Sequence, residues 1–283
     1  MTNVNAASPR TRRPTVIIEP KRGFGLNLRE VWAYRDLLLE LARRDVKLRY
    51  KQTALGVTWV ILQPLATALI FSVVFGGFAH LPSDGQPYIL FVFAGLLPWN
   101  LFTASLQRSS GSLVGAAGMI SKIYFPRILL PLASNGAVLV DFAVSFVVYM
   151  ILAVFYQAIP GWRVVALPFF LILALLTAVG ASLWFSSLSV YYRDFMHIVP
   201  FIIQAWTYAS PVVYATSIVP EKWRWLLSIN PAAGFVEGFR WALLGSSNLT
   251  VNMVIISTLS TLVFFFSGIM IFRRIERGFA DVI

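Results

Sequence analysis

The sequence predicts an all-α membrane protein with six transmembrane helices, an N-terminal amphipathic interface helix and a re-entrant helical hairpin between the fifth and sixth spans. Three observations predict this fold class. Of 283 residues, 58% are hydrophobic and 12% charged, whereas a soluble domain is about half apolar and about a quarter charged. Apolar runs long enough to cross a bilayer recur along the chain. The 23 Lys and Arg residues all fall outside those runs.

The N-terminal part precedes the first apolar run. Residues 1–25 contain several arginines and no apolar stretch, so we expect a disordered basic tail and no signal peptide. Residues 26–55 predict an amphipathic cytoplasmic interface helix, because apolar and charged residues separate onto opposite sides at 100° per residue. Asp45 falls within the apolar side, and Arg49 lies one turn later. These two charges are expected to pair and to contact the bundle or a partner.

Residues 56–283 form the predicted six-span domain. A helical span needs about 20 mostly apolar residues. Proline interrupts the second candidate at Pro98 and flanks the fifth at Pro200 and Pro211, which neighbouring helices can accommodate. The six candidates are 56–78, 88–107, 129–156, 164–190, 198–217 and 250–272.

The basic residues predict the orientation. Most of them lie before residue 56, in the second-to-third connection and at the C-terminal end, whereas the connection between the first two spans has none. The positive-inside rule therefore predicts a multi-pass protein with both termini in the cytoplasm.

Two connections have structure of their own. The cytoplasmic link 108–128 mixes apolar, aromatic and basic residues, which suits either a docked amphipathic helix or a solvated loop. The outer region 218–249 is aromatic and broken at Asn230 and Pro231, which predicts two short helices around a turn. A re-entrant hairpin and an interfacial aromatic belt formed by Trp223 and Trp225 are the two interpretations, and the apolar content favours the hairpin.

Several kinds of catalytic or binding site can be excluded from the sequence. The chain has no Cys, no clustered metal ligands and no Gly-x-x-x-x-Gly-Lys phosphate loop. We therefore expect no metal site and no enzyme active site in this chain, and if ATP drives the protein, another chain binds the ATP. Asp141 is the clear carboxylate within a span, and a paired structural group is favoured over a proton relay. The net charge of +11 is expected to face an anionic membrane rather than nucleic acid.

Several stretches together resemble the membrane subunit of ABC exporters that move lipid-linked polysaccharides such as O-antigen, capsule or teichoic acid. They run in order across the chain from about residue 30: 44–51 with Gly56 and Trp59, 95–102, 120–127, 192–195, 210–214, and 230–231 with Glu237 and Arg240.

The resemblance implies a homodimer in the bacterial inner (plasma) membrane with two copies of a cytoplasmic ATPase subunit. ATP and Mg would bind that partner, and this chain would hold no cofactor. The link 108–128 would carry a coupling helix, and the tight link 192–194 would face the same partner. The residues expected to couple to the ATPase are Lys122, Tyr124, Phe125, Arg127, Arg193 and Asp194.

The expected substrate is an isoprenoid-diphosphate-linked polysaccharide, O-antigen above all. Cations at the interface helix would attract the diphosphate or anionic membrane lipids: Arg43, Arg44, Lys47 and Lys51. Aromatic and amide side chains would contact sugars along the channel: Gln204, Trp206, Tyr208 and Tyr214. Trp223, Trp225, Asn230 and Pro231 would form the outer mouth.

Two alternatives stay open at this stage. An exporter of a small hydrophobic drug would share the architecture but need a narrower, less aromatic path. An ATP-independent carrier or membrane scaffold would have no ATPase partner. A neighbouring gene for an ATPase with a phosphate loop would argue against the ATP-independent carrier or scaffold and would agree with either kind of ABC exporter.

Overall fold

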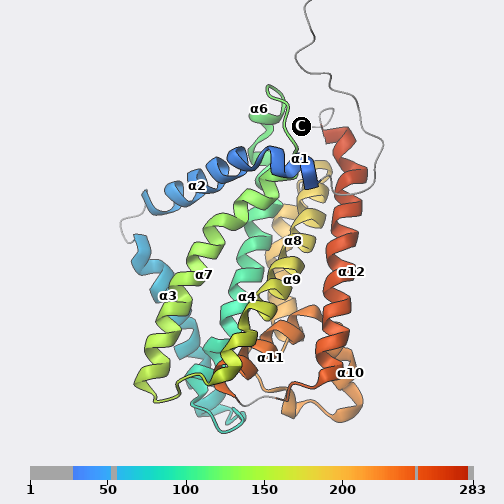
Figure 1. Cartoon of the computed structure of the whole chain (residues 1–283). Coiled ribbons are helices and arrows are strands. Elements are labelled where there is room, and N and C mark those ends of the chain that lie inside the picture. The colour runs from blue at the N-terminus through green and yellow to red at the C-terminus, as the bar shows by residue number, and fades with distance from the viewer. Residues whose placement is uncertain (1–27, 52–55, 246–247, 280–283) are drawn as a thin grey trace, which may run out of the picture.

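The computed structural model describes residues 28–51, 56–245 and 248–279, and all regular secondary structure in that part of the chain is helical. Long helices stand side by side, and the N-terminal helix α2 lies across one end of them (Figure 1). The short helices α10 and α11 lie at the opposite end. We call these the α2 end and the α11 end. The predicted basic tail, residues 1–25, lies outside the described residues.

Five helices in the described part are long and apolar enough to cross a membrane. They correspond to the first, second, third, fourth and sixth predicted spans. Their elements are α3 (Gly56–Phe71) with the π-helical η1 (Ser72–Phe78), α4 (Tyr88–Ser110), α7 (Leu129–Phe155), η2 (Trp162–Ala166) with α8 (Leu167–Tyr191), and α12 (Val251–Ile275).

The fifth predicted span is not one continuous helix. Helix α9 (Phe195–Ala209) has 15 residues, a length of about 22 Å against a hydrocarbon core of about 30 Å. It ends at Ser210 because the residue before a proline disfavours helical torsion angles, and Ser210 is extended at φ −112°, ψ 147°. The chain then continues without regular helix to the 3₁₀ turn η3 (Thr216–Ile218).

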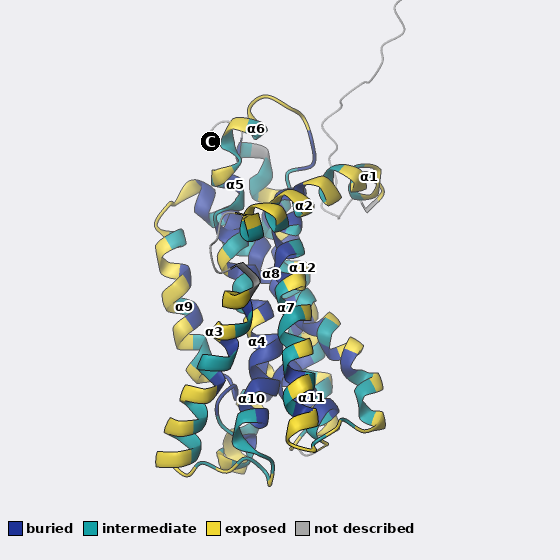
Figure 2. Cartoon of the chain, turned by 90° about the vertical axis from the view of Figure 1, so that its left-hand side faces the viewer, coloured by how far each residue is buried: buried dark blue, intermediate teal, exposed yellow. Residues whose placement is uncertain are grey.

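Helix α4 forms the centre of the bundle. It packs against α3, α7, α8 and α11, and most of its residues are buried (Figure 2). Helices α8 and α12 approach with almost no side chain between them, since a Cβ added at Gly268 would lie 2.3 Å from the Gly180 carbonyl oxygen. Small residues allow such close packing in membranes.

The predicted interface helix is present as α1 (Leu28–Ala33) and α2 (Arg35–Lys51). Its apolar side packs on α7, where a Cβ added at Gly136 would lie 2.7 Å from the Ala42 Cβ. The predicted basic side, with Arg43, Arg44, Lys47 and Lys51, is exposed. The predicted turn into the first span falls on residues 52–55, outside the described part.

The outer region folds as the two short helices predicted, α10 (Glu221–Ile229) and α11 (Pro231–Leu244). Asn230 ends the first and caps the second, because its side chain accepts a hydrogen bond from the Ala232 amide and Pro231 begins α11. Helix α11 is almost entirely buried among α4, α8 and α12, whereas α10 is mostly exposed.

Candidate functional site

A polar cavity of about 210 Å³ lies between α3, α4 and α7, where α2 also reaches. Three of its lining residues carry amides: Gln63 on α3, and Asn100 and Gln107 on α4. The spacing of Asn100, Thr103 and Gln107 places them on one face of α4. All three amide side chains belong to exposed residues, and within the described part of the chain none makes a side-chain hydrogen bond.

Exposed amides are costly in a span that faces acyl chains. Transferring an amide to an apolar environment without a partner costs about 2–7 kcal/mol. Polar groups in membrane spans therefore face a bundle interior or a polar path. The amides of Gln63, Asn100 and Gln107 therefore mark a polar side of the bundle.

An ion pair closes the α2 side of this cavity. Arg49 Nη2 of α2 lies 2.8 Å from Oδ2 of Asp141 on α7. The Tyr50 hydroxyl donates to the other oxygen, Oδ1, at 2.7 Å. Burial, with the adjacent Asp141, raises the pKa of Tyr50 to about 12, so this hydroxyl keeps its proton at physiological pH. Asp141 is thus a paired group that fastens the interface helix to a span, as favoured from the sequence.

Asp45 and Arg49 were expected to pair with each other at their one-turn spacing. The structure instead brings Asp45 to its neighbour Arg44, at 3.0 Å, and Arg49 to Asp141. The reason is the packing of α2 on α7, which brings Arg49 beside Asp141. Arg49 does contact the bundle, which was one of the two expected roles.

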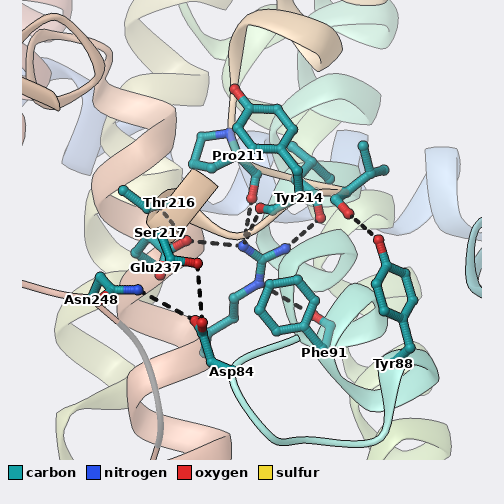
Figure 3. Close-up of polar contacts among 12 residues, drawn as sticks. Asp84, Tyr88, Phe91, Pro211, Tyr214, Thr216, Ser217, Glu237 and Asn248 are labelled. Atoms are coloured by element: carbon teal, nitrogen blue, oxygen red, sulfur yellow. Dashed lines mark hydrogen bonds and ion pairs between the residues drawn. The ribbon is translucent and has the colours of Figure 1, made fainter. Parts of the chain in front are cut away.

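A second polar cluster is built around Arg240 of α11. Figure 3 labels several of its partners, among them Phe91, Pro211, Tyr214 and Glu237. Arg240 is fully buried and forms an ion pair with Glu237 at 2.9 Å. Its guanidinium also donates to the carbonyl oxygens of Phe91, Pro211, Val212 and Tyr214.

The Arg240 cluster supplies hydrogen bonds for the broken segment after α9. Residues 211–214 have no helix to satisfy their carbonyl groups, and three of the four accept from Arg240. The fourth, Val213, accepts from the Tyr88 hydroxyl at 2.8 Å. Irregular backbone at membrane depth requires such internal partners. From the sequence Arg240 was given no structural role, although its i, i+3 spacing from Glu237 was a usable signal.

The four residues predicted to line a channel separate into two groups. Gln204 and Tyr208 lie exposed on α9. Trp206 donates to the Asn230 side chain at 3.0 Å and packs its ring 5.0 Å from that of Phe102. The Tyr214 carbonyl accepts from Arg240. None of the four lines the polar cavity.

The predicted outer-mouth residues fall into two groups, one exposed on α10 and one at the junction of α10 and α11. Trp223 and Trp225 are exposed on α10, by 51% and 57%. Asn230 and Pro231 form the junction of α10 and α11, and Asn230 Nδ2 donates to the Ser210 hydroxyl at 2.9 Å. The junction is therefore fixed to the end of α9.

The predicted coupling region projects from the α2 end (Figure 1). It contains the single-turn helices α5 (Ser112–Gly115) and α6 (Ala117–Ile120), followed by a loop. Lys122 and Tyr124 are exposed on the loop, whereas Phe125 is buried. Arg193 and Asp194 are exposed in the tight link between α8 and α9.

Arg127 differs from the other predicted coupling residues because it is held inside the chain. Its Nη1 donates to the Glu276 carbonyl oxygen, and its guanidinium carbon lies 5.9 Å from the centre of the Phe279 ring. Burial raises the pKa of the Glu276 carboxyl, which lies 3.3 Å from Arg273. Arg127 thus joins the coupling region to the segment after α12.

Comparison with known proteins places this geometry in a family. The family model described as "ABC-2 type transporter" matches residues 36–244, from the interface helix to the end of α11. The chain belongs to the ABC-2 type transporter family. It is a membrane permease subunit of that family, and the five apolar helices agree with a multi-pass membrane protein.

This ABC-2 permease is similar to several proteins that export or transport polysaccharides by name. The O-antigen export system permease protein RfbA of Klebsiella pneumoniae is 29% identical over 251 residues, which is 88% of this chain and 95% of the relative. RfbA of Myxococcus xanthus is 27% identical, over 75% of this chain and 82% of the relative. The polysialic acid transport protein KpsM of Escherichia coli is 24% identical, over 83% and 92%.

Proposed function

We propose that this chain is the channel-forming membrane subunit of an ATP-driven exporter for an isoprenoid-diphosphate-linked polysaccharide, O-antigen above all. The observation that carries the proposal is the alignment with O-antigen export permeases over nearly the whole of both chains. The exposed amides of the polar cavity support it, because sugar hydroxyls need hydrogen-bonding partners along the path.

The distribution of basic residues and the lengths of the helices indicate how the chain is placed in the bilayer. The coupling region and the basic side of α2 face the cytoplasm, and the α11 end faces outward. Helix α9 and the segment up to residue 217 together make the fifth of six crossings. Helices α10 and α11 form the re-entrant hairpin, and the hydrogen bonds of Arg240 support an irregular segment at that depth.

Two copies of the chain with two ATPase subunits form the working transporter in this proposal. A single copy leaves Gln63, Asn100 and Gln107 exposed, together with apolar residues of α3 and α9. A second copy across that side would enclose the amides and cover the apolar surfaces. The ATPase subunits, which hold ATP and Mg, would dock on the exposed loop around Lys122 and on the link at Arg193.

The diphosphate and the sugars have different partners in this proposal. Arg43, Arg44, Lys47 and Lys51 on the exposed side of α2 attract the anionic diphosphate or anionic lipid at the cytoplasmic leaflet. The sugars then follow the amides between α3 and α4.

The test is complementation in a strain that lacks its own O-antigen export permease and carries the matching ATPase. Expression of this chain should restore surface O-antigen, measured by gel electrophoresis of lipopolysaccharide and by surface antibody binding. A chain that inserts in the membrane but leaves the polymer inside the cell contradicts the proposal. Restored resistance to a hydrophobic drug without polymer export would favour the drug exporter.

A further inference from the structure

A second cavity, of about 450 Å³, lies at the α11 end and is separate from the polar cavity. Its walls are the loop 156–163 after α7, residues 86–87 ahead of α4, and the last turn of α11 at residues 242–245. We call it the α11-end pocket. Its volume is in the range that holds small molecules.

The lining of the α11-end pocket combines rings, amides and a cation. Tyr156 and Trp162 supply rings that are 41% and 79% exposed. Gln86, Gln157 and Arg163 supply hydrogen-bonding groups. A sugar ring presents an apolar C–H face that packs on an aromatic ring and hydroxyl groups that bond to amides and guanidinium. This set of side chains therefore suits a carbohydrate.

Two of these groups are held in place before any ligand binds. The Arg163 guanidinium donates to the Gly245 carbonyl oxygen, and its central carbon lies 5.2 Å from the centre of the Trp241 ring. The Trp162 ring meets the same Trp241 ring edge-on at 6.4 Å. A preorganised site loses less entropy on binding.

Gln157 has a backbone conformation that favours glycine. Its φ is +56° at the position directly after the last cap of α7, where glycine is usual. The turn is formed by bonds from the Gln157 and Ala158 amides to the carbonyls of Val154 and Ala153. In the described part of the chain the Gln157 side-chain amide has no hydrogen-bond partner. Such a conformation at a residue other than glycine is a reason to test that residue for a function.

We infer that the α11-end pocket binds a sugar unit of the polymer on the outer face of the membrane, an inference that rests on the proposed polysaccharide export. Helices α4 and α7 both line the polar cavity, and both have an end at this pocket. A polymer that leaves the polar cavity toward the α11 end meets the rings of Tyr156 and Trp162. Binding there holds the emerged polymer and opposes its backward movement.

The test uses the full chain in lipid nanodiscs with cellobiose, lactose and α-1,2-mannobiose as probes. Saturation-transfer difference NMR should show transfer to sugar C–H protons with the native chain. Trp162→Ala should reduce the transfer at least fivefold, whereas Trp223→Ala, which removes an exposed ring outside the pocket, should leave it unchanged. Gln157→Gly should reduce binding at least threefold without lowering the unfolding temperature.

Several results would overturn the inference. These are no transfer to any probe from the native chain, equal transfer from Trp162→Ala, or a Gln157→Gly chain that binds as well as the native one. If the surroundings of Trp162 change with the anionic lipid content of the nanodisc but not with added sugar, the pocket binds lipid headgroups instead of sugar. Sugar binding without restored export contradicts the proposed function alone, whereas restored export without sugar binding contradicts the pocket alone.

Discussion

Arg49 on the interface helix forms an ion pair with Asp141 in the middle of span α7, at 2.8 Å between Nη2 and Oδ2. Residues 92 positions apart are thereby joined at the edge of the polar cavity. The pair is only partly exposed, with side-chain exposures of 29% and 14%. It links a helix at the membrane surface to the wall of the path proposed for sugars.

We predict that Asp141→Asn destabilises the chain by about 1–3 kcal/mol, because Arg49 then loses the partner of a partly buried charge. The swap of Arg49→Asp with Asp141→Arg should recover part of the loss. Thermal unfolding in detergent measures both. Asp45→Asn is the matched control, since its pair with Arg44 is more exposed, and an equal loss from this variant would contradict the prediction.

The Tyr50 hydroxyl provides a test by pH. Its pKa is raised to about 12 from the ordinary value of about 10, so the neutral donor is favoured by folding. That contribution is complete below the unfolded pKa and is lost only as pH rises toward about 12. Tyr50→Phe should therefore lower stability by about 1 kcal/mol, equally at pH 6, 7 and 9. An effect that changes across this range would show that another titrating group controls the contact.

Arg240 should tolerate no replacement. Arg240→Lys keeps the charge but cannot reach carbonyl groups of Phe91, Pro211, Val212 and Tyr214 together. Each buried carbonyl left without a donor costs about 1–3 kcal/mol. We expect little inserted protein and rapid trypsin cleavage after membrane preparation. Arg224→Lys on exposed α10 is the control and should accumulate normally. Normal accumulation of Arg240→Lys would mean that the broken segment has other support.

The amides of the polar cavity should matter for export more than for folding. Asn100→Leu and Gln107→Leu should lower polymer export at least fivefold while the unfolding temperature stays constant, because neither exposed amide makes a side-chain hydrogen bond in the described part of the chain. Asn100→Gln and Gln107→Asn keep an amide and should retain most export. Export at the native rate by the leucine variants would exclude these positions from the polymer path.

Lys122 and Arg127 should differ, although both were expected to couple to the ATPase. Lys122→Glu changes an exposed charge, so it should reduce ATP-driven export without loss of stability. Arg127→Glu should also lower stability, because it breaks the contacts with Glu276 and Phe279. ATPase activity of the complex, export and thermal unfolding together measure the difference. Native export by Lys122→Glu would remove that residue from the coupling surface.

The helices were largely predictable because each leaves a local pattern. Six apolar runs were expected to span, and five of them are helices of spanning length. The charge separation predicted α2, and Asn230 with Pro231 predicted the junction of α10 and α11. The length of the fifth span was not predictable from hydropathy. The apolar run continues past Ala209, whereas the backbone is broken before Pro211.

The site was less predictable because it depends on how the helices face one another. The aromatic residues of α9 suggested sugar contacts, but Trp206 joins α9 to Asn230. The spacing of Asn100, Thr103 and Gln107, which was not used, could have indicated a polar face on α4, but not that Gln63 and Asp141 share its cavity. The partner of Arg49 required the packing of α2 on α7.

The hydrogen bonds of Arg240 have a consequence for how this chain can vary. Three of the carbonyl oxygens that accept from the guanidinium belong to Pro211, Val212 and Tyr214, and every amino acid carries such an oxygen. The conformation of residues 211–214 therefore depends on a helix that follows them in the chain, together with Tyr88 at the start of α4. The side chains of Val212 and Val213 are buried in the core, so substitution at these two positions is limited by packing and not by these hydrogen bonds.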